Sequence, residues 1–311
     1  MRMDNRYMNT VNGFYFNTDN TITADCASPV LERVLDICAY YENLLSKTIP
    51  GSDIWRINHS CGEPVEISPH TTRIISLALE MREASGGKFD IAIGSVTSLW
   101  RFTDGSNIIP DSQALTGAVA AAKNAVVELT GDTVRTQGGT ELDVGGIAKG
   151  YIADAIADEL RKSGVESALI NLGGNIVTVG LKPDGTPWKI GLQVPFTDRT
   201  YRDKFWSAVY CTDGSVVTSG SYERGFRNGG NWYHHIIDTA TGMPAVSDVL
   251  SVTICAASGF LADALSTPLF LLGEHEGLTL ADRYGVDAAY YLKDNRIVLN
   301  KGMNARISGC T

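Results

Sequence analysis

The sequence lacks the cysteine spacing of a metal or disulfide framework. Its six cysteines form no C-x-x-C pair and have no adjacent histidine pattern, so neither a structural zinc site nor a disulfide-stapled fold is expected. A chain of 311 residues is long enough to bury a core without such staples. We therefore expect buried free thiols at Cys26, Cys38, Cys61, Cys211, Cys255 and Cys310.

The sequence also lacks a charged-then-apolar leader. It has no run of the roughly 18 apolar residues that a membrane-spanning helix needs. No transmembrane segment is predicted, and a cytoplasmic location is favoured. The alternative is an exported protein or lipoprotein whose leader is not part of this sequence.

Basic charge is in short supply. The chain has 26 Lys and Arg against 35 Asp and Glu, a formal net charge of −9, and no basic stripe interrupts this balance. Nucleic acid and anionic membrane surfaces are therefore not expected as partners. An anionic ligand would need a local device such as a helix N-terminus, a metal ion or a single lysine.

The hydrophobic pattern predicts an α+β fold. Ser28-Pro29 and Ser68-Pro69 are typical helix starts, with serine as N-cap and proline at the first helical position. Asp213-Gly214, between two short apolar runs, is typical of a hairpin turn. Helices are predicted at 28–46, 68–85, 112–124, 147–163 and 259–272, with a further helix near the end. Strands are predicted at 18–25, 125–129, 141–144, 168–172, 176–181, 189–194, 209–211, 215–218 and 249–256, with a closing hairpin at Asp294-Asn295. We expect two intimately packed lobes of mixed or antiparallel sheets flanked by helices, with a boundary near residues 130–165.

A glycine pair lies between a predicted strand and a predicted helix, in the segment L-D-V-G-G-I-A-K-G at 142–150. Adjacent glycines let a ligand approach the backbone closely, and the free N–H groups of the first helical turn favour a phosphate. Lys149 would add a positive charge. The segment is not a Walker loop, because neither Ser nor Thr follows the lysine. A tight turn without any ligand explains the glycines equally well.

Asp263 and Thr267 are four residues apart on a predicted helix, so their oxygens project from one face. A carboxylate and a hydroxyl suit Mg²⁺ better than zinc. The alternative is structural, with Asp263 stabilising the helix start and Thr267 bonding to a backbone carbonyl. Pro268 should free the carbonyl of Ala264 and bend the helix beside this pair.

Two adjacent histidines occur in the segment Y-H-H-I-I-D-T-A-T-G at 233–242. Neighbouring side chains on a strand point to opposite faces, so one histidine can face a cleft while the other meets solvent. A histidine near neutrality can accept a proton from an incoming hydroxyl, and Asp238 could take that part instead. A purely structural histidine is the third possibility. Upstream, T-S-G-S-Y at 218–222 offers hydroxyls in another glycine-bearing turn.

The motifs form an ordered series. D-x-G-G-I-A-K-G-Y is followed by N-L-G-G-N, T-S-G-S-Y, H-I-I-D-x-x-T-G-x-P and A-D-A-L-S-T, and preceded by L-L-S, S-D-I-W-R-I-N, G-K-F-D and I-G-S-V-T-S-L-W. This series, from about residue 14 to 300, resembles the ApbE family of FAD:protein FMN transferases. The resemblance implies an ApbE-like fold, with residues 1–311 as one flavin transferase domain of two interleaved lobes.

The resemblance also implies an activity. A member of this family would use Mg²⁺ to split the diphosphate of FAD, transfer FMN through a phosphoester to a Ser or Thr hydroxyl of a target flavoprotein, and release AMP. The target would carry a D-G-x-[ST]-G-[AS]-T-like segment. Two alternatives stay open: a Mg²⁺-dependent FAD pyrophosphatase that yields FMN and AMP, and a non-catalytic FAD-binding protein.

Site residues follow from the resemblance. The metal set would be the Gly146 carbonyl, the Asp263 carboxylate and the Thr267 hydroxyl, and His235 would be the catalytic base. The expected FAD contacts are Phe16, Asn58, Lys88, Phe89, Asp90, Asp143, Lys149, Ser219 and the backbone of Ile237. The chain departs from the family in two places, where Phe16-Asn17-Thr18 replaces M-G-T and Thr239-Ala240 replaces Pro-Arg.

Overall fold

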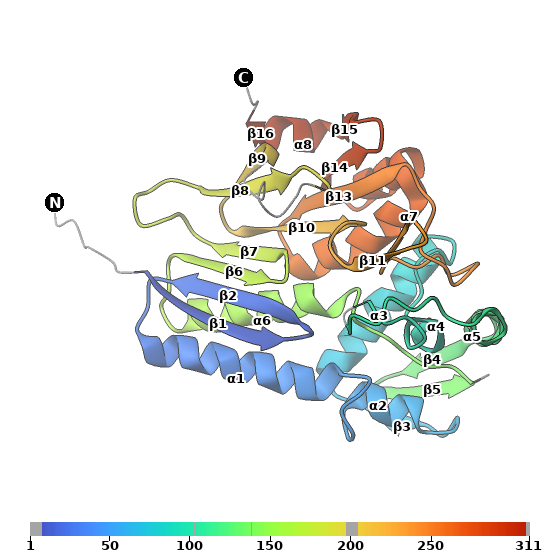
Figure 1. The fold of residues 1–311 in the computed structure, drawn as a ribbon. Helices are drawn as coiled ribbons and strands as arrows, with labels where there is room; N and C mark the ends of the chain where they lie inside the picture. The colour runs from blue at the N-terminus through green and yellow to red at the C-terminus, as the bar shows by residue number, and fades with distance from the viewer. Residues whose placement is uncertain (1–7, 103, 138, 197–204, 309–311) are drawn as a thin grey trace.

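A computed structural model describes residues 8–102, 104–137, 139–196 and 205–308. Its centre is an eight-stranded sheet in the order β1-β2-β6-β7-β10-β13-β14-β15 (Figure 1). All neighbours in this sheet pair antiparallel. The strands are β1 (Asn9–Tyr15), β2 (Thr18–Ala24), β6 (Ala168–Leu172), β7 (Asn175–Val179), β10 (Gly214–Gly220), β13 (Val249–Ala256), β14 (Asp287–Leu292) and β15 (Ile297–Leu299).

Both faces of the central sheet are covered. Helices α1 (Ser28–Leu45), α6 (Ala148–Lys162) and α7 (Gly259–Arg283) pack on one face (Figure 1). The small sheet of β8 (Trp188–Gln193), β9 (Phe205–Cys211) and β16 (Ile307–Ser308), with α8 (Lys301–Arg306), covers the other. Because side chains alternate along a strand, Val217 and Ile254 join the helical core while Val216 and Cys255 join the smaller one.

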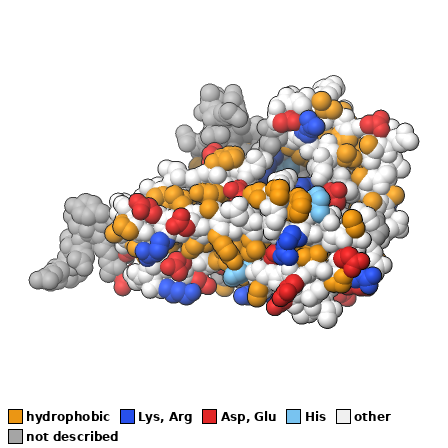
Figure 2. Space-filling model, turned by 90° about the horizontal axis from the view of Figure 1, so that it is seen from below, with side chains coloured by type: hydrophobic (Ala, Val, Ile, Leu, Met, Phe, Trp, Pro, Cys, Tyr) orange, Lys and Arg blue, Asp and Glu red, His pale blue; other side chains and the backbone are white. Residues whose placement is uncertain are grey.

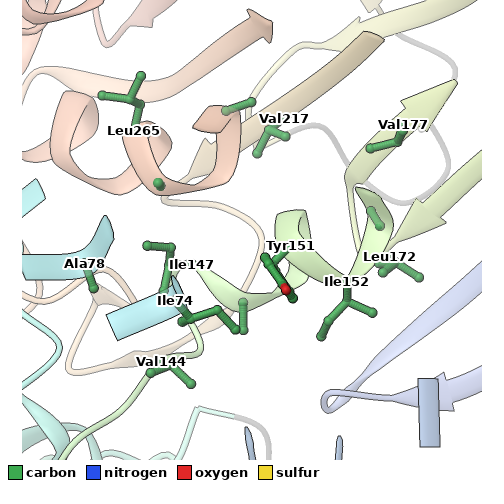
Figure 3. Packing of buried hydrophobic residues seen from close by; sticks show 14 of the residues in the cluster. Ile74, Ala78, Val144, Ile147, Tyr151, Ile152, Leu172, Val177, Val217 and Leu265 are labelled. Carbon is green, nitrogen blue, oxygen red and sulfur yellow. The ribbon is translucent and has the colours of Figure 1, made fainter. Parts of the chain in front are cut away.

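The remaining elements lie beside the central sheet and its helices (Figure 1). They are α2 (Asp53–Asn58), β3 (Val65–Glu66), α3 (Pro69–Ala84), α4 (Gly94–Thr97), α5 (Ser112–Lys123), β4 (Val126–Thr130), β5 (Thr133–Gln137), β11 (Gly225–Asn228) and β12 (Asn231–His234). Strands β3, β5 and β4 form a second small sheet, and β11 and β12 form a hairpin. Figure 3 shows that the core is continuous across the junction, since Ile74 and Ala78 of α3 join the cluster that holds Ile147, Ile152 and Leu265.

The helix predictions are confirmed within a few residues, although the first cap is not. Ser68 caps α3 by accepting a hydrogen bond from the His70 N–H at 3.2 Å. Ser28, by contrast, is the first helical residue of α1, and Ala27 precedes it without a side-chain cap. The predicted final helix is the second half of α7, which continues to Arg283 across a non-helical Gly273 with φ 82°. The break thus falls at that glycine and not at Pro268.

Two strand predictions are wrong. Residues 141–144 form no strand, only a parallel bridge from Glu141 to Ile93, because the Asn58 side chain takes up the backbone hydrogen bonds of Leu142. The Asp213-Gly214 turn joins β9 and β10, which lie in different sheets. It is therefore a crossing between two layers and not a hairpin. The closing hairpin of β14 and β15 is confirmed.

The cysteines described are free, but not all are buried. Cys38, Cys211 and Cys255 are buried, Cys26 is half-buried and Cys61 is exposed, while Cys310 lies outside the described residues. No helix in the described ranges is long and apolar enough to cross a membrane. Acidic and basic side chains are interspersed on the face shown in Figure 2. The division into two lobes near residues 130–165 stays a prediction.

Candidate active site

A cavity of about 500 Å³ opens between the central sheet, α7 and several loops. It gathers segments that are far apart in the sequence: the end of β10, the loop before α6, the loop after α3 and the segment after β12. Its lining includes eleven of the predicted site residues, namely Lys88, Phe89, Asp90, Asp143, Gly146, Lys149, Ser219, His235, Ile237, Asp263 and Thr267. The fold therefore brings most of the predicted set to one place.

A close crossing of α6 and α7 positions the Asp263 carboxylate. The Gly150 N–H donates a hydrogen bond to Asp263 Oδ2 at 2.9 Å. A Cβ on Gly150 would lie 2.1 Å from the Gly259 carbonyl oxygen and 2.6 Å from the Asp263 Cβ, so only glycine permits this approach. Asp263 is the fifth residue of α7, and Ser258 and Asp154 cap the start of that helix. Stabilisation of the helix start is thus not what Asp263 does.

The Thr267 hydroxyl lies beside the Gly146 backbone. A Cβ built on Gly146 would lie 3.8 Å from Thr267 Oγ1 and 3.5 Å from a ring carbon of Phe89. Ser266, one residue earlier, donates to the Asp263 carbonyl at 2.9 Å, whereas Thr267 Oγ1 forms no hydrogen bond with any described residue. The predicted alternative, in which Thr267 bonds back to a carbonyl, is therefore wrong.

These atoms fit a hard divalent cation. Asp263 is buried (4% exposed), and among described residues its Oδ1 has no hydrogen-bond donor. An empty carboxylate oxygen, a free hydroxyl and a glycine backbone without a covering side chain are the oxygen ligands that Mg²⁺ prefers. No group of three or more His, Cys, Asp or Glu in the described ranges could hold a metal. A cation here would take its remaining ligands from water or substrate, as Mg²⁺ commonly does.

Asp143 is held by a cation from outside the lining. Its Oδ2 accepts from Lys47 Nζ at 2.9 Å and from Thr97 Oγ1 at 2.7 Å, and its Oδ1 accepts from the Gly145 N–H at 2.9 Å. Desolvation acts to raise the Asp143 pKa, but the Lys47 ammonium and these hydrogen bonds outweigh it and lower the pKa. Asp143 is therefore an anion that fixes the glycine turn ahead of α6.

Asn58 and Phe16 do not line the cavity. The Asn58 side chain accepts from the Leu142 N–H at 2.7 Å and donates to the Leu142 carbonyl at 3.0 Å, so it positions the residue before Asp143. Phe16 lies in the β1–β2 turn with φ 56°, and its N–H donates to Glu42 Oε1 at 2.7 Å. Thr18 is the residue of this turn that reaches the cavity. Direct FAD contacts by Asn58 and Phe16 stay predictions.

The loop after α3 is fastened to the segment after β12. Asp90 pairs with Arg82 Nε at 2.9 Å and accepts from the Ala92 N–H, while its burial raises its pKa. The Thr239 hydroxyl donates to the Gly87 carbonyl at 2.9 Å. Thr239, which stands where the resemblance predicts a proline, thus ties the two loops together at the cavity wall.

The two histidines differ in environment. His235 lines the cavity, and its N–H and ring Nδ1 contact the Arg224 carbonyl at 3.1 and 3.2 Å. A carbonyl only accepts, so Nδ1 carries the proton and Nε2 keeps its lone pair. Burial, followed by the nearby Arg224 guanidinium, lowers the His235 pKa to about 3. The ring is therefore neutral at pH 7 and able to accept a proton.

His234 points the other way, but not to solvent. It is buried, its ring Nε2 donates to the Ala245 carbonyl at 3.1 Å, and it packs against Phe270. The expectation of a solvent-facing histidine is wrong because the His234 ring packs against Phe270 of α7. Asp238 does not line the cavity; its Oδ1 accepts from the Ala240 N–H at 2.8 Å and closes a turn. His235 is thus the base candidate that the cavity presents.

Sequence reasoning missed Lys47, Thr97 and Arg224. Thr97 and Arg224 line the cavity, and Lys47 is the ion-pair partner of Asp143. Lys47 follows L-L-S directly and Thr97 lies inside I-G-S-V-T-S-L-W, so both were within quoted motifs. Arg224 follows the T-S-G-S-Y segment by two residues, and an arginine so close to a glycine turn in an acidic chain was the available signal.

Comparison with known proteins decides the family. The family model described as "ApbE family" matches residues 9–290. The chain belongs to the ApbE family. A FAD:protein FMN transferase of Klebsiella pneumoniae (strain 342) is 36% identical over 281 residues, which cover 89% of this chain and 86% of that protein. One of Treponema pallidum is 36% identical over 295 residues, covering 89% and 81%.

Solved ApbE structures share the fold. The ApbE protein of Thermotoga maritima superposes with a TM-score of 0.86 at 28% identity, covering 97% of this chain and 100% of that one. The flavin transferase ApbE from Vibrio cholerae gives 0.84 at 25% identity, covering 96% and 100%. The predicted family and α+β fold are confirmed, and the chain is an ApbE enzyme of the transferase class.

Proposed function

We propose that this ApbE protein is a Mg²⁺-dependent FAD:protein FMN transferase. The FMN moiety of FAD would be transferred to a Ser or Thr hydroxyl of a flavoprotein with a D-G-x-[ST]-G-[AS]-T-like segment. The observation that carries the proposal is the presence, in one cavity, of a neutral His235 and the oxygen set of Gly146, Asp263 and Thr267. The names of the similar transferases support the same chemistry.

The chain's own residues account for binding and proton transfer. His235 Nε2 takes the proton of the acceptor hydroxyl as its oxygen bonds to the FMN phosphorus. The bond from that phosphorus to the AMP oxygen breaks, and AMP leaves with the electron pair. The Arg224 carbonyl accepts the hydrogen bond from His235 Nδ1–H. The other ring nitrogen, Nε2, therefore keeps its lone pair and faces away from this carbonyl. The protonated ring then returns its proton to water.

The metal set adds charge neutralisation. A Mg²⁺ ion at Gly146, Asp263 and Thr267 would neutralise the diphosphate and stabilise the charge on departing AMP. One Asp263 oxygen accepts a hydrogen bond from the Gly150 N–H in the free protein, so the orientation of the carboxylate is fixed before a ligand binds. Such preorganisation avoids reorganisation during the reaction.

Intact-mass analysis tests the proposal directly. The purified protein is mixed with FAD, Mg²⁺ and a protein fragment carrying the acceptor segment, and AMP is measured in parallel. The expected result is an FMN mass increase on the fragment with equal AMP, abolished by a chelator and by replacing the acceptor Ser or Thr with Ala. FMN and AMP without an adduct would indicate a pyrophosphatase. FAD that stays intact would indicate a binding protein.

A further inference from the structure

Arg224 is a cavity cation that the carboxylates Asp90 and Asp143 do not use as an ion-pair partner. The carboxylates of Asp90 and Asp143 are paired with Arg82 and Lys47, neither of which lines the cavity. Both carboxylates therefore have ion-pair partners outside the cavity lining, and the basic side chains in the lining are not needed to neutralise them. Arg224 does line the cavity, and its guanidinium forms no hydrogen bond or ion pair with a described residue.

The position of Arg224 is fixed by its backbone. In the β11–β12 register Gly225 lies opposite His234, so Arg224 and His235 are the next facing pair. The Arg224 carbonyl accepts from the His235 N–H at 3.1 Å and contacts its Nδ1 at 3.2 Å. The residue that orients the base thus places a cation beside it.

A partly buried guanidinium whose charged neighbour is one exposed carboxylate, Glu223, and which has no hydrogen bond or ion pair with a described residue, is unfavourable in the free protein. Burial lowers the Arg224 pKa despite the neighbouring Glu223, which reflects the cost of removing the cation from water. An anion bound in the cavity would offset this cost. The planar fork of arginine fits two oxygens of one phosphate, which a lysine ammonium cannot match.

We propose that the Arg224 guanidinium is a catalytic residue that binds the transferred FMN phosphate of FAD from the His235 side of the cavity. This inference rests on the proposed transferase function. The phosphate would then lie between two positive charges: the Arg224 guanidinium beside β11 and a cation held by Gly146, Asp263 and Thr267. Charge that develops on the phosphoryl oxygens during transfer would be stabilised from both sides.

The same contact would couple substrate to base. In the free protein the Arg224 guanidinium is one of the cations that keep His235 unprotonated. The FMN phosphate of FAD, a monoanion within the diphosphate, would offset that repulsion at the step in which His235 must accept a proton. The base would therefore gain proton affinity in the complex and stay neutral without it.

The test compares FAD with riboflavin, which has the same ring system but no phosphate. In Arg224→Met the affinity for FAD should fall about 10-fold or more, because a charge-assisted hydrogen-bonded pair is lost. The affinity for riboflavin should change less than about twofold. At saturating FAD, the single-turnover rate of FMN transfer should fall about 100-fold. Arg224→Lys, which keeps the charge but loses the fork, should recover only part of both losses.

Arg227→Met is the matched control. Arg227 lies on the same hairpin, is exposed, and stacks its guanidinium over Trp232 at 6.0 Å. Its removal changes the net charge equally and should leave both affinities unchanged. Thermal unfolding of each variant reports folding, and Arg224→Gln replaces Arg224→Met if the latter does not fold.

Two results would overturn the inference. Equal losses of FAD and riboflavin affinity would assign Arg224 to packing, and an unchanged transfer rate would remove it from catalysis. Failure of the proposed function is distinguishable, because the wild-type protein would then bind FAD without forming an adduct. The ratio of FAD to riboflavin affinity would still decide whether Arg224 contacts the phosphate.

Discussion

Replacing Gly150 with alanine should separate α6 from α7 at the point where Asp263 is held. The new Cβ would lie 2.1 Å from the Gly259 oxygen, whereas ordinary contacts begin at 3.4 Å, so the helices must part by about 1.3 Å. Backbone lies on the other side of this contact, so no side chain can rotate away. Overpacking of this kind costs about 1–3 kcal/mol, less the roughly 0.5–1 kcal/mol that alanine gains over glycine in a helix.

The separation also removes the Gly150 hydrogen bond from Asp263. A displacement near 1 Å at a reacting group costs roughly 100-fold in rate. We therefore expect Gly150→Ala to lower the free energy of unfolding by about 1–2 kcal/mol, to reduce FMN transfer about 100-fold and to raise the Mg²⁺ concentration needed for half-maximal rate. Urea denaturation and transfer assays over a Mg²⁺ series measure these quantities.

Gly117→Ala is the control for glycine in a helix. Gly117 is exposed in α5, and a Cβ there would meet no atom within 4 Å. This substitution should stabilise the protein by about 0.5–1 kcal/mol and leave transfer unchanged. The reasoning would be refuted if Gly150→Ala had wild-type stability and the same Mg²⁺ dependence, since the helices would then tolerate a side chain at their crossing.

Three further predictions concern the proposed metal set and base. Asp263→Ala should abolish Mg²⁺-dependent transfer while a cooperative unfolding transition persists; unchanged activity would remove Asp263 from the metal set. His235→Ala should slow transfer by about 10²–10⁴-fold with FAD affinity nearly retained, and a proportional loss of both would reassign His235 to ligand binding. The folded-state pKa of His235, about 3, lies below its ordinary 6.5, so between these values the unfolded chain binds a proton that the folded chain does not. The free energy of unfolding should therefore decrease as the pH is lowered, by about 2 kcal/mol between pH 7.5 and pH 5. In His235→Gln, the decrease in the free energy of unfolding over this pH range should be smaller than in the wild type by about that amount. The same pH dependence in both proteins would contradict the low His235 pKa.

The hydrophobic pattern predicted most of the fold because local rules and tertiary packing agree there. The α6 helix and the β13 strand have strong periodicity and clear flanking signals, and both were placed within one residue. Residues 141–144 failed because their partner is a side chain, Asn58, more than 80 positions away. The Asp213-Gly214 turn failed because turn chemistry is local and does not say which sheet each neighbouring strand joins.

Part of the candidate site could likewise be predicted from the sequence. The order of the motifs predicted Asp263, Thr267 and His235 as site residues, and all three line the cavity. Periodicity alone left the pair of Asp263 and Thr267 open to a structural interpretation. The free Thr267 hydroxyl and the capping of α7 by Ser258 and Asp154 argue against it. The glycine turn before Arg224 was a sequence signal for this residue, but its importance depends on which anions are already paired elsewhere in the fold. Lys47 and Arg82 satisfy those anions from outside the cavity.

The contact between Gly150 and Asp263 joins residues 113 positions apart, and this has a consequence for how the chain folds. Contacts of such sequence separation form slowly, because a long loop must close before they give any stabilisation. The cation set therefore exists only once α7 has docked on α6. A nascent chain without its last 50 or so residues would have no α7 contact to complete the set. Bound Mg²⁺ and FAD should accordingly stabilise the whole chain against unfolding and proteolysis, by a free energy that rises with the logarithm of their concentration.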